Sequence, residues 1–252
     1  MTLVWTRSPY YWEEDKKNLD KEKINYLYLP CLEYKILKKK FSFPLVSPSK
    51  SKIILTSFLA AKIIVNNSQF KRALKNSQIF VMGKKTFDFL NKQDLNVHWV
   101  KSSSASELAQ KILEQSSSGD FFILPGPLER AFPMDVFFKE KGYDVCKIDC
   151  YQTVKKVRTS AFEILDKGYQ KKIAYDSNFV VSFGSPSAVQ AFLSEFSLYL
   201  KELRKNISVI VLGETTKKVC ATSFKEVFLT EEPKLENIIK IYQSLSSNSN
   251  FS

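Results

Sequence analysis

The sequence predicts an α/β protein built from two similar domains, each with a parallel sheet. Short apolar runs alternate with stretches of helical periodicity, which is typical of parallel strands covered by helices on both faces. Two strand–turn–helix stretches occur again about half a chain length further on, so the chain of 252 residues contains an internal repeat. The length suffices for one or two hydrophobic cores. Each copy of the repeat is expected to hold about five strands.

The stretch 178–203 predicts a strand, a tight turn and a helix. Residues 178–181 form an apolar run, and apolar residues recur at helical spacing from Val189 onward. Ser185 stands where a helix N-cap belongs and Pro186 at the first helical position, where its missing N–H costs nothing. Free backbone N–H groups and a hydroxyl in such a turn suit an anion. An ordinary capped surface helix explains the same residues.

The stretch 52–64 has the same pattern 128 residues earlier in the chain. An apolar strand is followed by a hydroxyl pair and a helix start, and Ser57 takes the place of Ser185. The recurrence favours a functional turn over a chance cap, because both copies would present the same donors at the same edge of a sheet.

A second pair of stretches, 79–90 and 209–220, places a Gly-x-x-Thr turn between a buried strand and a helix. Thr86 and Thr216 are equivalent and lie 130 residues apart. A lysine doublet falls at each of these turns, so a cation and free N–H groups are available to hold one carboxylate.

The remaining elements of the two copies also correspond. Each copy ends with a strand and a helix, and each begins with two further strands. The paired ranges are 97–113 with 227–245, 2–7 with 121–125, and 24–30 with 145–151.

Composition excludes several classes of protein. Hydrophobic residues make up 44% of the chain and only 7 residues are Gly, so we expect disorder only in the Ser/Asn-rich tail, 244–252. The N-terminus lacks a signal-peptide pattern and no apolar run has the length of a membrane span, which predicts a cytoplasmic protein. Four scattered cysteines beside a lone histidine, His98, predict no metal site, and His98 is expected to be an ordinary strand residue.

The net charge of +12 predicts an anionic partner. Nucleic acid is one candidate, but the basic residues are dispersed in short runs without an RNA-binding signature or a helix-turn-helix pattern. Neither a dinucleotide fingerprint nor a Walker lysine motif is present, which argues against hydride and phosphoryl transfer. In parallel sheets ligands bind beyond the carboxyl ends of the strands, so the hydroxyl-rich turns suit a polyanionic small molecule.

In this order and spacing, the motifs resemble those of the uroporphyrinogen-III synthase family over nearly the whole chain. No single motif is specific, and the order carries the resemblance. The set comprises Thr6-Arg7, Thr56-Ser57, Gly83 to Thr86, Arg130, Tyr151-Gln152-Thr153, Ser185 to Val189 and Gly213 to Thr216.

The resemblance implies two α/β domains that interleave in sequence, joined by two crossing extended segments, 33–43 and 151–158, with a ligand cleft between the domains. It places residues 1–36 with 155–252 in the first domain and 37–154 in the second. The repeat alone would divide the chain near residue 118. The two divisions differ in which copy's first two strands join which sheet, and similarity between the halves does not decide between them.

The resemblance further implies a lyase of tetrapyrrole and haem biosynthesis. The family cyclises hydroxymethylbilane, a linear tetrapyrrole with an acetate and a propionate on each ring, to uroporphyrinogen III, with loss of water and inversion of the last ring. No metal or organic cofactor takes part. The enzyme would be a monomer that contacts neither membrane nor nucleic acid, with a possible handover of substrate from hydroxymethylbilane synthase.

Tyr151 matches the family tyrosine and is the predicted catalytic residue, assisting the hydroxyl that leaves. The predicted carboxylate-binding residues are hydroxyl-bearing or arginine side chains, and for each arginine a structural salt bridge is an equal alternative. They are Arg7, Ser57, Thr86, Arg130, Ser185, Ser187 and Thr216.

Three positions depart from the family pattern: Glu214, where Pro is usual, Leu59, and the loop 125–127 before Arg130. Two other functions stay open at this point. One is a non-catalytic binding protein for a polyanionic small molecule, and the other is a basic nucleic-acid-binding protein, whose affinity would fall steeply with salt.

Overall fold

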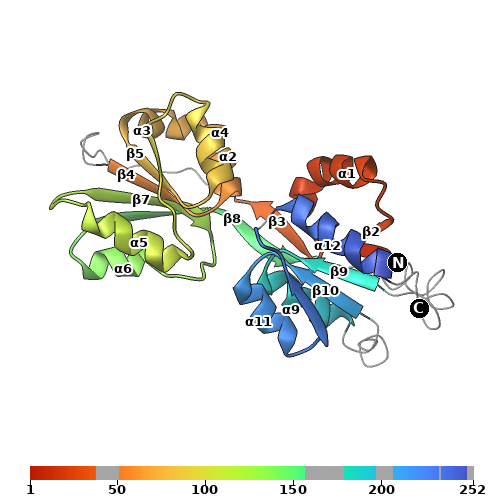
Figure 1. Ribbon diagram of the computed structural model, residues 1–252. Helices are drawn as coiled ribbons and strands as arrows, with labels where there is room; N and C mark the ends of the chain where they lie inside the picture. Colours follow the sequence, from red (N-terminus) through yellow and green to blue (C-terminus); the bar gives the residue numbers. More distant parts are fainter. Residues whose placement is uncertain (38–50, 157–178, 197–206, 233, 249–252) are drawn as a thin grey trace. The chain divides into compact units, whose positions relative to one another are not determined.

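The computed structural model describes residues 1–37, 51–156, 179–196, 207–232 and 234–248. The chain divides into two compact units, each with one sheet and helices on both of its faces (Figure 1). Unit 1 comprises Met1–Tyr34 with Val154–Ser252, and unit 2 comprises Lys35–Thr153. Residues 38–43 of the predicted connecting segment 33–43 and the end of the predicted helix near residue 203 lie outside the described residues.

The sheet of unit 1 has five strands in the order β11-β10-β9-β1-β2, and all four neighbouring pairs are parallel. Its strands are apolar and short, as expected for strands covered on both faces. The elements of this unit are β1 (Thr2–Trp5), a 3-10 turn (Pro9–Tyr11), α1 (Trp12–Lys21), β2 (Tyr26–Tyr28), β9 (Phe179–Phe183), α9 (Pro186–Phe196), β10 (Ile207–Val211), α11 (Glu214–Ala221), β11 (Glu226–Leu229) and α12 (Leu235–Asn248).

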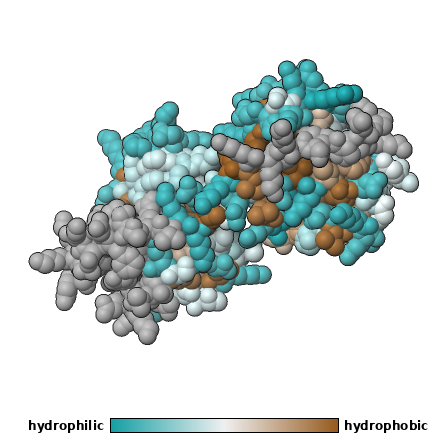
Figure 2. Space-filling view, turned by 180° about the vertical axis from the view of Figure 1, so that it is seen from behind, coloured by the Kyte–Doolittle hydropathy of each residue, from teal (hydrophilic) through white to brown (hydrophobic). Residues whose placement is uncertain are grey.

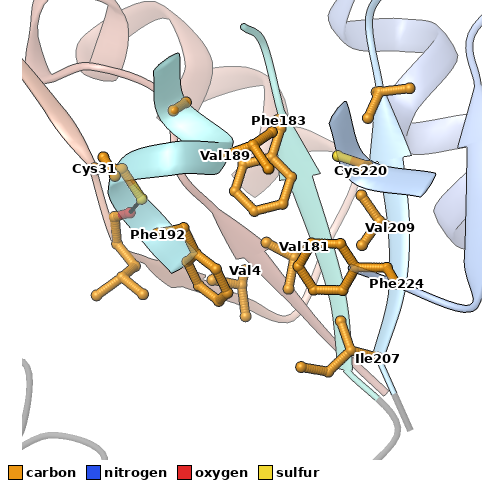
Figure 3. Close-up of a cluster of buried hydrophobic side chains, with 14 of the residues drawn as sticks. Val4, Cys31, Val181, Phe183, Val189, Phe192, Ile207, Val209, Cys220 and Phe224 are labelled. Atoms are coloured by element: carbon orange, nitrogen blue, oxygen red, sulfur yellow. Dashed lines mark hydrogen bonds between the residues drawn. The ribbon is translucent and has the colours of Figure 1, made fainter. Parts of the chain in front are cut away.

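Alternate residues of these strands pack into two layers of core. One layer lies under α9 and α11, where Phe192 and Phe224 meet Val181 and Val209 (Figure 3). The other lies under α1 and α12 and includes the fully buried Leu3. The period of two along each strand therefore sends successive side chains into opposite layers.

Unit 2 holds most of a six-stranded sheet in the order β3-β8-β7-β4-β5-β6. The four pairs from β8 to β6 are parallel. The elements are β3 (Leu32–Ile36), β4 (Ser51–Leu55), α2 (Phe58–Val65), a 3-10 turn (Ser68–Phe70), α3 (Lys71–Asn76), β5 (Gln78–Val81), α4 (Lys84–Asn91), β6 (Val97–Trp99), α5 (Ala105–Glu114), β7 (Phe121–Pro127), α6 (Met134–Glu140) and β8 (Asp144–Lys155).

The core of unit 2 has the same two-layer arrangement. Helices α5 and α6 cover one face of the sheet, where Phe122 stacks on Phe138 with ring centroids 4.0 Å apart. Helices α2, α3 and α4 contact β4 and β5. Ile64, Leu74 and Leu90 from these helices are buried.

The predicted repeat is present in the fold. Strands β9, β10 and β11 follow one another in the sheet of unit 1 as β4, β5 and β6 do in unit 2, and β1 with β2 occupies the places of β7 with β8. The first two strands of the chain thus join the C-terminal strands, which similarity between the halves could not decide. The domain boundaries that the resemblance implies, 1–36 with 155–252 and 37–154, stay a prediction about which residues fold as one domain.

The two predicted connecting segments are extended where the structure describes them, as β3 and the C-terminal part of β8. Leu37 N donates to Cys150 O at 3.0 Å, and Lys156 N donates to Cys31 O at 3.0 Å. Strands β3 and β8 are neighbours in the sheet, so the two extended segments pair with each other.

The tail 244–252 is not irregular throughout, which corrects the prediction. Helix α12 continues to Asn248 because Leu245 still packs on the core of unit 1. Ser247 Oγ donates back to Gln243 O at 2.6 Å, which satisfies a polar side chain inside the helix.

The histidine and the cysteines are structural in character. His98 lies in β6 and stacks on Phe80, with centroids 5.1 Å apart. All four cysteines are free thiols. Within the described ranges there is no group of three His, Cys, Asp or Glu side chains that could hold a metal ion.

No helix in the described part of the chain is long and apolar enough to cross a membrane.

On the face shown in Figure 2, most of the coloured surface is hydrophilic, with smaller apolar areas among the teal residues. Three large apolar side chains among the described residues are notably exposed: Ile36, Trp99 and Val136. Scattered apolar residues of this kind are normal on a protein surface.

Candidate active site

The tyrosine predicted to be catalytic meets the predicted serine of unit 2. Tyr151, in β8, is 6% exposed, and its hydroxyl lies 2.9 Å from Ser57 Oγ. Ser57 is the N-cap of α2, and its Oγ also accepts from Ala60 N at 3.3 Å. The cap thereby fixes the serine oxygen, and the serine oxygen in turn fixes the phenol at the carboxyl edge of the sheet.

The equivalent turn of unit 1 is built the same way but has a different second partner. Ser185 Oγ accepts from Ala188 N at 3.3 Å, as the sequence predicts for an N-cap. Its other neighbour is the hydroxyl of Ser187, at 3.1 Å, on an exposed side chain. This turn therefore presents two adjacent hydroxyls at the start of α9.

The two Gly-x-x-Thr turns also agree in geometry. Gly83 and Gly213 are the N-caps of α4 and α11, and each accepts from the backbone N–H of its threonine at 3.0 Å. Thr86 and Thr216 are 4% and 3% exposed, and neither hydroxyl bonds another side chain within the described residues. The first N–H groups of each helix point out of the turn, which leaves them for an anion.

The departures at Glu214 and Leu59 have simple structural accounts. Glu214 is exposed in the first turn of α11, where a carboxylate is favoured by the helix dipole. Leu59 is buried in the core of unit 2 at 2% exposure, so an apolar residue is required there.

Arg7 is held by a buried carboxylate. Its guanidinium lies 2.8 Å from Asp15 and 4.1 Å from the centre of the Tyr11 ring. Asp15 is 2% exposed and also accepts from Trp5 Nε1 at 3.1 Å. A buried charge needs such partners, so the salt bridge that the sequence left open is present.

A small cavity of about 20 Å³ lies beside Arg7 in unit 1, at the carboxyl ends of β1 and β9. This is where the strand order of the sheet changes direction, the position at which open parallel sheets bind ligands. Its volume is that of about one water molecule. Its lining includes Trp5, Arg7, Ser182, Gly184 and Leu235.

Arg130 also has protein partners. Its Nε donates to Pro127 O and one Nη to Ile148 O, both at 3.0 Å, and Asp149 lies 3.4 Å away. Its side chain is 12% exposed, and burial lowers the pKa of the guanidinium from its ordinary value. Two of its five N–H donors bond the main chain of unit 2.

The predicted site residues thus form separate groups within each unit. Unit 2 brings Ser57 and Tyr151 together. In unit 1, Arg7 and Gly184, the residue before Ser185, line one cavity. The sequence analysis missed Asp15 and Asp149, the partners of the two arginines. Neither aspartate lies at a regular helix or strand spacing from its arginine. The available signal for Asp15 was its place on the buried face of the helix 12–21, beside Leu19, where an acidic residue is unusual.

Parallel sheets with donor-rich turns at their carboxyl edges define a class of α/β proteins that bind anionic small molecules. The family model of uroporphyrinogen-III synthase HemD matches residues 14–240 of this chain. The chain belongs to the uroporphyrinogen-III synthase family, and is accordingly a lyase of tetrapyrrole biosynthesis.

Solved structures share the fold. Uroporphyrinogen-III synthetase from Helicobacter pylori has 18% identity and a TM-score of 0.62, over 97% of this chain and 99% of that chain. A mutant uroporphyrinogen III synthase from the extremely thermophilic bacterium Thermus thermophilus has 12% identity and a TM-score of 0.64, over 98% and 99%. No curated protein matches this chain by sequence.

Proposed function

We propose that this chain cyclises hydroxymethylbilane to uroporphyrinogen III and that Tyr151 assists the departure of the terminal hydroxyl. The observation that carries the role of Tyr151 is its 2.9 Å contact with Ser57 Oγ. A buried phenol at a sheet edge, held by a capped serine, is a fixed proton donor rather than a mobile surface side chain.

The hydrogen-bond arrangement permits donation by the phenol to the substrate. Ser57 Oγ accepts from Ala60 N, so its own proton can be donated to the Tyr151 oxygen. We assign the tyrosine O–H as the donor to the leaving oxygen of the substrate. As the C–O bond of the hydroxymethyl group breaks, the leaving oxygen takes this hydrogen bond or proton and departs as water. The remaining extended cation is attacked by the far ring through a spiro intermediate.

The substrate carries eight carboxylates, two on each ring, so many anchoring groups are required. The turns that begin α4, α9 and α11 offer them, through Thr86, Ser185, Ser187 and Thr216 with the neighbouring backbone N–H groups. The net charge of +12 raises the local concentration of such a ligand. Arg7 stays a carboxylate-binding candidate because its side chain is 32% exposed beside the cavity of unit 1.

The enzyme would act in the cytoplasm as a monomer and would receive its substrate from hydroxymethylbilane synthase. Size-exclusion chromatography with light scattering tests the oligomeric state. Mixing the two purified enzymes and comparing the yield of type III product with and without a competing trap for free substrate tests the handover.

A coupled assay tests the activity. Hydroxymethylbilane is generated in situ, the purified chain is added, and the oxidised products are separated as type I and type III uroporphyrin. Predominantly type III product is expected. Type I alone, which forms without catalysis, from a demonstrably folded protein would leave only a binding function for the polyanion.

A further inference from the structure

The register of unit 2 changes immediately before Tyr151. Strands β7 and β8 pair in step from Phe121 with Asp144 to Gly126 with Asp149, and the next pair is Pro127 with Tyr151. The pairing with β7 passes over Cys150, so two residues of β8 advance against one of β7. This is a β-bulge, and bulges next to active sites re-aim a side chain.

The bulge brings Tyr151 level with Ser57. Strand β4 pairs with β7 in step, Ile53 with Ile123, and Ser57 itself keeps an extended backbone. Continued at the same step, this register places Ser57 beside Pro127, which is the register partner of Tyr151. Without the extra residue, Pro127 would face Cys150, and the tyrosine would lie one residue further along the sheet. The 2.9 Å contact of the two hydroxyls depends on this shift.

Arg130 bonds the main chain of both strands at the bulge. Its Nε donates to Pro127 O of β7, and one Nη donates to Ile148 O of β8, each at 3.0 Å. A Cβ added to Gly126 would lie 3.4 Å from Arg130 Cζ, so the guanidinium packs directly on the glycine. The planar fork of an arginine suits two carbonyls on different strands, which a single ammonium cannot hold in the same way.

The ionic partner of Arg130 is secondary to these bonds. Asp149 lies 3.4 Å from the guanidinium and 3.8 Å from Lys147 Nζ, and its side chain is 22% exposed. The main-chain bonds are shorter, at 3.0 Å. The contacts of Arg130 therefore differ from those expected of a free fork for a substrate carboxylate.

We infer that Arg130 is a positioning residue: it fixes the Gly126–Pro127 bulge and thereby the placement of the Tyr151 hydroxyl on Ser57. The inference rests on the proposed role of Tyr151 for its catalytic consequence, but the placement of Tyr151 can be measured without substrate.

Tyrosine labelled with ¹³C at the ζ carbon makes the placement visible by NMR. The resonance of Tyr151 is assigned by its loss in Tyr151→Phe, and Ser57→Ala supplies the chemical shift of a phenol that lacks its serine partner. In Arg130→Met the Tyr151 resonance is expected to move toward the Ser57→Ala position. In Asp149→Asn, which keeps the main-chain bonds of Arg130, the Tyr151 resonance should stay within about a few tenths of a ppm of its wild-type chemical shift. An unmoved Tyr151 resonance in folded Arg130→Met would overturn the inference.

Kinetics separate positioning from substrate binding. A displaced proton donor lowers kcat, so Arg130→Met is expected to lose about tenfold in kcat, less than the roughly hundredfold at the low end of general acid catalysis, with KM within about twofold. Arg130→Lys should recover only part of this loss. A large rise in KM with kcat unchanged would instead assign Arg130 to a substrate carboxylate and sink the positioning role.

Gly126→Ala carries the test if Arg130→Met does not fold. The added methyl group would lie 3.4 Å from Arg130 Cζ, in direct contact with the guanidinium and without removing any donor, and the Tyr151 resonance and kcat are expected to change together. If Tyr151→Phe keeps full kcat while Arg130→Met still shifts the Tyr151 resonance, the proposed role of Tyr151 fails and the positioning inference stands. If Tyr151→Phe loses kcat and neither Arg130→Met nor Gly126→Ala shifts the resonance, the inference alone fails.

Discussion

The two units share a strand order and a pair of capped turns, yet only one of them places a phenol at its first turn. Ser57 and Ser185 each accept from the backbone N–H three residues on, at the same 3.3 Å. The second partner is Tyr151 in unit 2 and Ser187 in unit 1. By strand register, the place of Tyr151 falls in unit 1 at Cys31–Leu32, and neither of these residues has a hydroxyl.

This difference separates two duties of the repeated turn. The cap and the free N–H groups are present in both copies, so both can hold an anion. Among the described residues, a phenol lies on the cap serine of unit 2 and a second serine lies on that of unit 1. The comparison therefore predicts that unit 2 contributes chemistry and binding, whereas unit 1 contributes binding.

A second difference lies at the buried start of the matched strands. Lys52 of β4 takes the place of Val180 of β9, which is fully buried. Lys52 Nζ lies 2.7 Å from Asp120 and 3.0 Å from Gln115 O. Unit 2 thus depends on an ion pair where unit 1 uses an apolar side chain.

The largest expected effect comes from making unit 2 like unit 1 at this position. Lys52→Val should lower the free energy of unfolding of unit 2 by about 3–5 kcal/mol, because Asp120 is left buried without its cation. Hydrogen exchange followed by mass spectrometry on peptides of each unit measures it. The double variant Lys52→Val with Asp120→Asn should recover much of the loss. Equal destabilisation of unit 1 peptides would show that the two units do not unfold separately.

Removal of the phenol oxygen tests the chemical difference directly. Tyr151→Phe should lower kcat for type III product by about 10- to 100-fold, at or below the lower part of the usual range for general acids, since the substrate also cyclises unaided. The coupled assay measures it. Tyr26→Phe is the matched control, because its hydroxyl bonds Asp20 on an exposed part of unit 1. A Tyr151→Phe variant with full kcat would show that unit 2 does not supply the proton donor.

Paired serine variants compare the turns. Ser57→Ala and Ser185→Ala each lose an N-cap and should lower stability by about 1 kcal/mol, as measured by urea unfolding. Only Ser57→Ala should also lower kcat, because only Ser57 holds the phenol. Ser185→Ala should raise KM instead. The same kinetic change in both variants would contradict the division of duties.

The smallest effect is one that the units share. Burial raises the pKa of Cys150, in unit 2, to about 11 and that of Cys220, in unit 1, to about 12, against an ordinary value of 9.0. The unfolded chain loses these thiol protons near pH 9, whereas the folded state keeps them to higher pH. The contribution of the neutral thiols to stability is therefore complete below pH 9 and is lost as the pH rises toward 11–12. Between pH 8 and 9.5 stability should fall by about 0.8 kcal/mol for each thiol.

Urea unfolding at the two pH values measures this loss. The variant with Cys150→Ala and Cys220→Ala should lose less stability over the same range, because lysine and tyrosine titration is common to both proteins. The same fall in that variant would show that the thiols do not cause it.

Local signals predicted most of the elements. The helix starts at Ser57 and Ser185 followed from the residue types, because a cap depends on three or four neighbouring residues. The Gly-x-x-Thr turns followed in the same way. The end of α12 was wrong because the serines of the tail suggested irregular chain, whereas Leu245 packs on the core and continues the helix.

The roles of the arginines could not be predicted from the sequence. Arg7 and Asp15 come together only when α1 packs beside β1, and Arg130 reaches Ile148 across a strand boundary. Residue types fix what a side chain can bind, but its neighbours are set by packing between distant segments.

The sequence by itself determined the repeat, the strands, the capped turns and the family, because these depend on local pattern and on the order of motifs. The repeat alone left open which sheet the first two strands join; the family resemblance predicted the C-terminal sheet, and the strand pairing shows it. Only the tertiary structure decided that Tyr151 lies on Ser57 rather than one residue away. Strand pairing and a single-residue bulge are set by contacts between segments far apart in the chain, and such contacts leave no periodic trace in either segment alone.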